Sequence, residues 1–225
     1  MNRYFVFVLF FCLFETVVFA QDKKAGREEC IVIGPKFSTT TSGISLSPCR
    51  KQVVYFPAEM YEQGMLEAIE FSFTKPSSEK GDTVGNKMPI LLKIYARNTE
   101  KNIPGDELLK DTIIIIPPKK NQKIKIDISK YGIVLPSEGF YCGFEAFSTD
   151  WYVKQGYLTM DNLSYQTKFP IGGNSIFHSP MIEATTNKKE VKKYQNYLLG
   201  GWAYEWTNVN EKYNLTLIIR LHIRT

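Results

Sequence analysis

The 225-residue chain contains two histidines, and neither lies in a catalytic motif. His178 comes just before a Ser-Pro pair, and His222 lies between Arg220 and Arg224 on the expected polar face of the last strand. The sequence patterns His-Glu-x-x-His, Gly-x-Ser-x-Gly and Cys-x-x-Cys, which mark zinc hydrolases, serine hydrolases and dithiol redox sites, do not occur. We therefore predict no catalytic residue, no metal site and no cofactor.

Two carboxylates, Glu145 and Glu205, come closest to a hydrolytic arrangement. Each lies in an aromatic-rich segment with the pattern of a strand. Glycosidases hold two carboxyl groups about 5 to 10 Å apart on either side of the scissile bond. A catalytic pair and two ordinary surface carboxylates are both compatible with the sequence.

An aromatic group, Trp202, Tyr204 and Trp206, alternates along one predicted strand. Because successive side chains of a strand point to opposite sides, these three rings share a face. They form either a platform on which a sugar ring stacks or a cover for the open side of the core. The two interpretations predict different solvent exposure for the rings.

A second aromatic group, Trp151, Tyr152 and Tyr157, follows the predicted strand over 140–146 and is expected in a loop. Loops carried by a rigid scaffold are where binding residues concentrate. Both aromatic groups are therefore our candidate ligand-binding residues.

Three cysteines follow the N-terminal segment: Cys30, Cys49 and Cys142. An odd number leaves at least one free thiol in an oxidising compartment. A disulfide between Cys30 and Cys49 would close a short loop and stabilise the fold by roughly 3 kcal/mol, and the sequence leaves it open whether this bridge forms. Cys142 alternates in phase with Phe140 and Phe144, which predicts a small buried core residue.

Residues 1–20 are organised like a secretory signal peptide. One cation precedes a short apolar run, and Val18 and Ala20 are the small residues of a cleavage site before Gln21. After this segment the chain has no apolar run as long as the roughly 18 residues of a membrane span. We expect an exported protein, located in the periplasm, at the outer-membrane surface or outside the cell, with a flexible mature N-terminus over 21–29.

The formal net charge is +5, from 28 basic and 23 acidic residues. Much of the positive charge lies in expected loops, above all in the stretch Asn187–Lys193, which we predict to be mobile. Cations on solvated loops are common, and export separates a protein from nucleic acid. We predict no nucleic-acid partner.

A hydrophobic period of two dominates the rest of the chain. Ile124, Ile126 and Ile128 alternate with charged residues, and the last strand repeats the pattern. Such alternation predicts strands that bury one face. Strands are predicted over 31–33, 52–56, 69–73, 90–94, 124–128, 140–146, 156–160, 175–178, 202–206 and 215–223.

A further strand is predicted over 112–116. This segment is apolar on both sides, which is typical of a central strand covered on both faces. The Pro-Gly pair at 104–105 predicts a turn, and no amphipathic helix longer than two turns is expected. The sequence thus predicts an all-β fold, a jelly-roll-like antiparallel β-sandwich of about ten strands in a single domain over 30–225.

Four segments in the middle of the chain carry a resemblance to a known module. They are Ile90–Tyr95, Ile103–Leu109, Ile126–Tyr131 and Pro136–Tyr141, the last continued by Gly143–Glu145. In their order and spacing they resemble an exported Bacteroidetes β-sandwich module of the kind found in carboxypeptidase-like regulatory domain-containing proteins. The resemblance implies a jelly-roll-like sandwich with no established activity, no agreed ligand and no peptidase chemistry.

Three functions stay open at this point. A non-catalytic structural or protein-interaction module at the bacterial envelope agrees with the missing catalytic motifs and with the resemblance. A carbohydrate-binding module would use exposed aromatic residues, and a glycoside hydrolase would use Glu145 and Glu205. The expected partner is an envelope protein or a glycan.

Overall fold

The computed structural model describes residues 29–37, 41–74, 87–118, 123–158, 179–200, 203–210 and 214–225. The predicted signal peptide and the predicted strand over 175–178 lie outside these residues.

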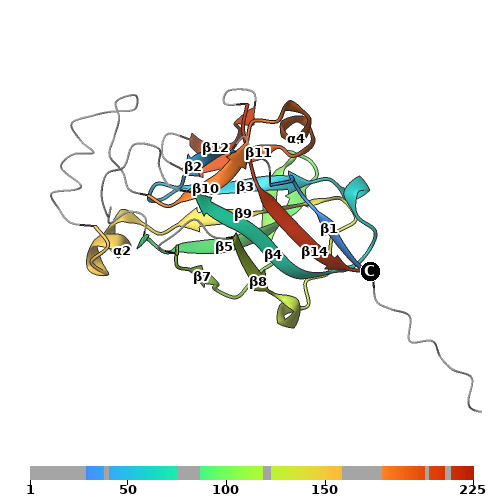
Figure 1. The fold of residues 1–225 in the computed structure, drawn as a ribbon, viewed down its shortest axis with the longest axis horizontal. Helices are drawn as coiled ribbons and strands as arrows, with labels where there is room; N and C mark the ends of the chain where they lie inside the picture. Colours follow the sequence, from blue (N-terminus) through green and yellow to red (C-terminus); the bar gives the residue numbers. More distant parts are fainter. Residues whose placement is uncertain are drawn as a thin grey trace, which may run out of the picture.

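Two antiparallel sheets pack face to face (Figure 1). The strands of the first, here called the β4 sheet, are β1 (Cys30–Ile33), β2 (Thr41–Ser45), β4 (Met65–Thr74), β8 (Lys123–Asp127), β10 (Met181–Thr185), β13 (Thr216–Leu217) and β14 (Ile219–Arg224). Their order is β1-β14-β4-β10-β13, with β2 paired to β10 and β8 paired to β4.

The second sheet, here called the β9 sheet, also has seven strands. They are β3 (Lys51–Phe56), β5 (Ile90–Asn98), β6 (Ile103–Glu107), β7 (Ile114–Ile115), β9 (Phe140–Ala146), β11 (Asn196–Gly200) and β12 (Ala203–Asn208). Their order is β12-β11-β3-β9-β5-β6, and β7 pairs with the first part of β5. The predicted all-β antiparallel sandwich is confirmed.

The core lies between the sheets and is rich in aromatic residues. Phe71 of the β4 sheet meets Phe144 of the β9 sheet edge to face, with ring centroids 4.7 Å apart. Cys142 is fully buried in the same core, as its alternation predicted. These contacts join the two layers through the positions that the period of two assigned to the core.

Two short helices flank the sandwich (Figure 1). In α2 (Thr149–Lys154) the Ser148 side chain accepts a hydrogen bond from the Trp151 amide, and in α4 (Lys188–Lys193) Asn187 caps Lys189 in the same way. Single-turn 3-10 helices lie at Ala58–Met60 and Ser129–Tyr131. The predicted mobile loop over 187–193 is therefore wrong, because its first residue is a good N-cap and the following lysines continue a helix.

Three other local predictions differ from the structure. The Pro-Gly pair at 104–105 lies within β6 and not in a turn. Residues 156–158 form turns after α2 and no strand. Residues 112–116 form no central strand: only Ile114–Ile115 are a strand, and this strand lies at the margin of the β9 sheet.

Candidate functional site

Strand β7 is an edge strand with apolar side chains in contact with solvent. Ile114 is 51% exposed and Ile116 is 67% exposed, whereas Ile115 between them is 4% exposed. Exposure alternates from Thr112 to Pro117, so the odd-numbered residues face the core and the even-numbered residues face outward. The segment thus forms one extended edge with a buried side and an exposed apolar side.

The pairing of β7 shows which side of its backbone is open. Ile90 pairs with Ile115 and Leu91 with Ile114, and the Leu92 amide donates to the Ile113 carbonyl at 3.0 Å. In an antiparallel ladder every second residue bonds to the neighbouring strand. Ile113 and Ile115 therefore bond to β5, while the N–H and C=O groups of Ile114 point away from the sheet.

Strand β8 is also an edge strand, but it carries charges. Lys123, Lys125 and Asp127 occupy its exposed positions, and its apolar residues face the core. Charged side chains on an edge oppose pairing with other chains. Among the described residues Thr112–Ile116 no charge serves this purpose, so β7 is the less protected of these two edges.

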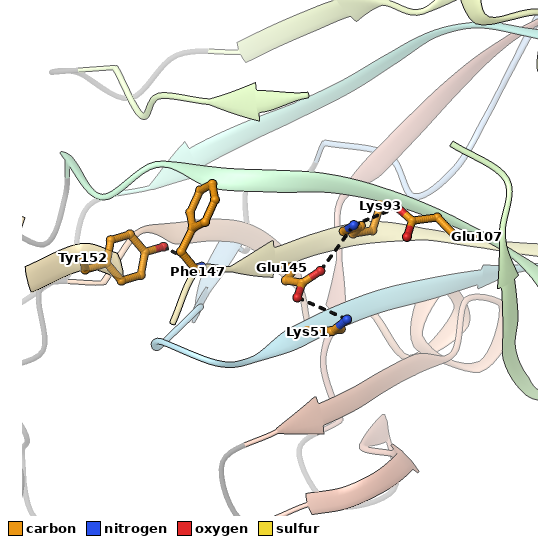
Figure 2. A network of polar contacts seen from close by, with 6 residues as sticks. All are labelled: Lys51, Lys93, Glu107, Glu145, Phe147 and Tyr152. Atoms are coloured by element: carbon orange, nitrogen blue, oxygen red, sulfur yellow. Dashed lines mark hydrogen bonds and ion pairs between the residues drawn. The ribbon is translucent and has the colours of Figure 1, made fainter. Parts of the chain in front are cut away.

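A ladder of charged side chains crosses the outer face of the β9 sheet (Figure 2). Glu145 accepts from Lys51 at 3.1 Å and lies 3.5 Å from Lys93, which also bonds to Glu107 at 2.7 Å. The four side chains are 18% to 32% exposed, so each pair contributes up to about 1 kcal/mol. This ladder fixes cross-strand register and engages both Glu145 oxygens.

Glu205 does not join Glu145. Glu145 lies on β9 and Glu205 on β12, with β11 and β3 between these strands. Trp206 packs against Tyr95 on the outer face, so its neighbour Glu205 points to the opposite face from Glu145. The hydrolase hypothesis therefore gains no support from the placement of these two side chains.

Tyrosines cover the remaining outer face of the β9 sheet. Tyr141 is fully buried between Tyr55 and Tyr197, with ring centroids 5.0 Å and 5.2 Å away. Half-buried Trp206 contacts Tyr95 edge to face at 5.8 Å. Trp206 thus belongs to a small second core. Trp202 and the side chain of Tyr204, the other members of its predicted group, lie outside the described residues.

The other aromatic group is split between core and surface. Tyr152, predicted to lie in a loop, is instead fully buried in α2, so the predicted loop position is wrong. Its hydroxyl donates to the Pro89 carbonyl at 2.6 Å and accepts from the Phe147 amide at 3.1 Å. Figure 2 shows Tyr152 beside Phe147. Burial raises the pKa of Tyr152 far above its ordinary value.

Trp151 and Tyr157 are half-buried and form a column of nearly parallel rings with Phe147. Phe147 and Trp151 stack at 3.8 Å, and Trp151 and Tyr157 lie 6.0 Å apart with an interplanar angle of 7°. Phe147 therefore covers one face of the Trp151 indole. This arrangement stabilises α2 against the sandwich and leaves less ring surface for a sugar than the sequence suggested.

An open pocket of about 410 Å³ lies on the outer face of the β4 sheet. Its lining residues are Cys30, Glu67, Ala68, Lys125, Asp127, His222 and Arg224. Arg224 pairs with Glu67 at 2.9 Å, and Asp127 bonds to the Ser129 amide and hydroxyl. The opposite charges are thus matched within the chain, and no ligand class follows from them.

His222 has partners on both sides of its ring. Its Nδ1 lies 3.3 Å from the Lys125 ammonium, which only donates, so Nδ1 accepts and Nε2 is directed as a donor to Glu70 at 3.4 Å. Within the described ranges no three His, Cys, Asp or Glu residues are placed to hold a metal ion. His178 lies outside these ranges.

Cys30 and Cys49 are both free and exposed. Cys30 pairs with Arg224 at the edge of the β4 sheet. Cys49 lies in a turn with φ of 61°, and its amide donates to the Phe147 carbonyl at the end of the β9 sheet. The disulfide that the sequence left open is not formed in this structure.

Comparisons with known proteins give no assignment. No family model matches the chain, and the searches of curated proteins and of solved structures also found no match. In the described part of the chain, no helix has the length and apolar character of a membrane span.

The residues that sequence reasoning missed are Ile114 and Ile116. The signal was present in the run of four isoleucines that ends at two prolines. Proline is confined to the ends and edges of sheets, since it cannot donate to the ladder. Pro117 and Pro118 therefore pointed to an edge, against the all-apolar run that suggested a centre.

Proposed function

We propose that the protein is an exported, non-catalytic β-sandwich that works as a protein-interaction module at the bacterial envelope and binds through β7. The observation that carries this proposal is the exposure of Ile114 on β7 and of Ile116 just after it, together with the Ile114 backbone N–H and C=O groups that point away from the sheet. Export rests on the signal-peptide pattern of residues 1–20, and the envelope rests on the resemblance to exported Bacteroidetes modules.

Strand addition is the binding mode that this edge favours. An extended segment laid beside β7 would bond to the backbone of Ile114 and cover its side chain. The backbone bonds supply affinity, and the side chains on alternate positions supply selectivity. Leu91 of β5 is half-buried beside Ile114 on the same face, so the apolar surface continues into the sheet.

The carbohydrate hypothesis receives less support from the described aromatic residues. Tyr152 is buried, Trp206 packs on Tyr95, and Phe147 covers a face of Trp151. A stacking site needs an open ring face, because the C–H groups of the sugar must reach it.

Site-specific photo-crosslinking tests the proposal in the cells that produce the protein. A benzophenone amino acid at position 116 should give a defined crosslinked complex. Val134 is the matched control, because it is apolar and 56% exposed but lies in an isolated bridge and not on β7. Adding Ile114→Lys to the position-116 chain should remove the complex. Equal products from positions 116 and 134, or no effect of Ile114→Lys, would contradict the proposal.

A further inference from the structure

Exposed side chains alternate with buried or half-buried ones over residues 112–116, the segment that contains β7. Thr112, Ile114 and Ile116 are its exposed residues, and Ile114 is the central one. The backbone groups of these even-numbered residues lie on the side away from β5, because Ile113 and Ile115 bond to β5. In the described residues no strand pairs with this side of β7.

We infer that the partner of β7 is β7 of a second copy of this chain, paired antiparallel about a two-fold axis through Ile114. This inference rests on the proposed function and names the partner. In this register Ile114 pairs with its own symmetry mate, and Thr112 pairs with Ile116 of the other copy. The backbone N–H and C=O groups of all three residues point away from β5 and toward the second copy. Each of these pairs is therefore a hydrogen-bonded pair of the antiparallel ladder.

Self-pairing fits the chemistry of this edge better than that of β8. Like charges placed directly opposite each other on neighbouring strands destabilise pairing. The outward residues Thr112, Ile114 and Ile116 carry no charge, so two copies meet without repulsion, and the isoleucine side chains cover each other. On β8 the exposed Lys123 and Lys125 oppose such contact.

The prolines set the length of the contact without preventing it. Pro117 occupies an odd-numbered, inward-facing position and is buried, so its missing N–H does not interrupt the outer side. Pro118 is the next residue whose backbone faces the second copy. Because proline has no N–H to donate, the ladder between the two copies ends there. Five residues from each copy form a small interface, and small interfaces give weak, reversible association. A contact about a two-fold axis uses the same surface of both copies, so association stops at the dimer.

Disulfide trapping tests both the partner and the register. The background chain carries Cys12→Ser, Cys30→Ser and Cys49→Ser, so that buried Cys142 is the one cysteine left of the four in the sequence. Ile114→Cys should form a dimer under mild oxidation, because residues that pair across a ladder have the Cα separation of a disulfide, about 5.5 Å. Val134→Cys is the control for random collision.

A mixture of two single variants fixes the register. Thr112→Cys and Ile116→Cys should crosslink to each other at least tenfold faster than either crosslinks to itself. In the background without exposed cysteines, Ile114→Lys places two ammonium groups opposite each other and should weaken the dimer at least tenfold in sedimentation velocity, with an unchanged circular dichroism spectrum.

The outcomes separate the inference from the proposed function. Ile114→Cys dimers that form no faster than Val134→Cys dimers, or a chain that stays monomeric up to millimolar concentration, would overturn self-pairing. If position 116 then still crosslinks to a different protein in cells, the proposed function stands with another partner. If position 116 crosslinks to nothing, both fail.

Discussion

Gly143 lies where two neighbouring strands of the β9 sheet approach each other closely. Gly143 faces outward between Glu145 and Tyr141, where a Cβ would lie 2.1 Å from the Gln52 carbonyl oxygen and 2.5 Å from the Val53 Cα. Strands β3 and β9 approach closely at this point. Glycine inside a strand often marks such an approach.

Gly143→Ala should therefore destabilise the fold by about 1 to 3 kcal/mol, because the new methyl group meets backbone atoms that cannot turn away. The free energy of unfolding in urea measures the effect. Gly132→Asn is the control: Gly132 has φ of 59°, a Cβ added there would meet no atom within 4 Å, and asparagine tolerates this conformation. Equal losses in the two variants would contradict the close approach.

Tyr152 contributes a hydroxyl to two backbone groups. Tyr152→Phe leaves the Pro89 carbonyl and the Phe147 amide without this partner, which should cost about 1 to 3 kcal/mol of stability. Tyr55→Phe should cost less, since the Tyr55 hydroxyl makes one exposed bond, to the Glu138 carbonyl. Thermal unfolding of both variants checks this order, and a larger loss for Tyr55→Phe would refute it.

At this scale the sequence predicted core residues better than surface sites. Cys142 and Phe144 are buried as their alternation indicated, because a period of two follows directly from strand geometry. The burial of Tyr152 was missed because α2 is a short helix that a serine cap starts after the strand. The contact between Tyr152 and Pro89 joins residues far apart in the chain, and no local pattern reports it.

At the scale of elements, strand β7 shows what local patterns leave out. The four isoleucines at 113–116, which include this strand, are equally apolar, yet burial alternates along them. Whether a strand lies at the centre or at the margin of a sheet depends on which strands pair beside it. Pairing partners come from distant parts of the chain, so the sequence predicted the strand but placed it in the wrong part of the sheet.

The alternation in β7 predicts opposite results for neighbouring residues. Ile115→Ala should cost about 2 to 4 kcal/mol, since it opens a cavity in the core. Ile114→Ala should change stability by no more than about 0.5 kcal/mol, because its side chain is exposed in the isolated chain. Chemical denaturation at low protein concentration compares the two. Similar losses would mean that β7 does not have one buried and one open side.

For the whole molecule, buried phenols limit stability in alkali. Burial raises the pKa of Tyr61, Tyr95, Tyr141 and Tyr152 above the ordinary tyrosine value. These groups stay protonated in the folded chain at a pH where the unfolded chain releases its protons. Their contribution is therefore complete below the unfolded pKa of about 10 and is lost as the pH rises above it.

Stability should thus fall above about pH 10, by up to about 1.4 kcal/mol per pH unit for each such tyrosine. Urea denaturation between pH 8 and pH 11 measures this slope, and absorbance at the phenolate band follows ionisation in the same samples. A stability that stays constant to pH 11, or phenolate absorbance from all tyrosines before unfolding, would contradict the burial of these rings.

Hydrogen exchange at β7 tests the central claim most directly, namely that this edge of the sandwich is open and serves for binding. In dilute protein the Ile114 amide should exchange much faster than the amide of Ile115, which bonds to β5. At high protein concentration, or with a bound partner, exchange at Ile114 should slow while its neighbours change little. An Ile114 amide already protected in dilute protein, or one that no concentration or partner protects, would contradict the account.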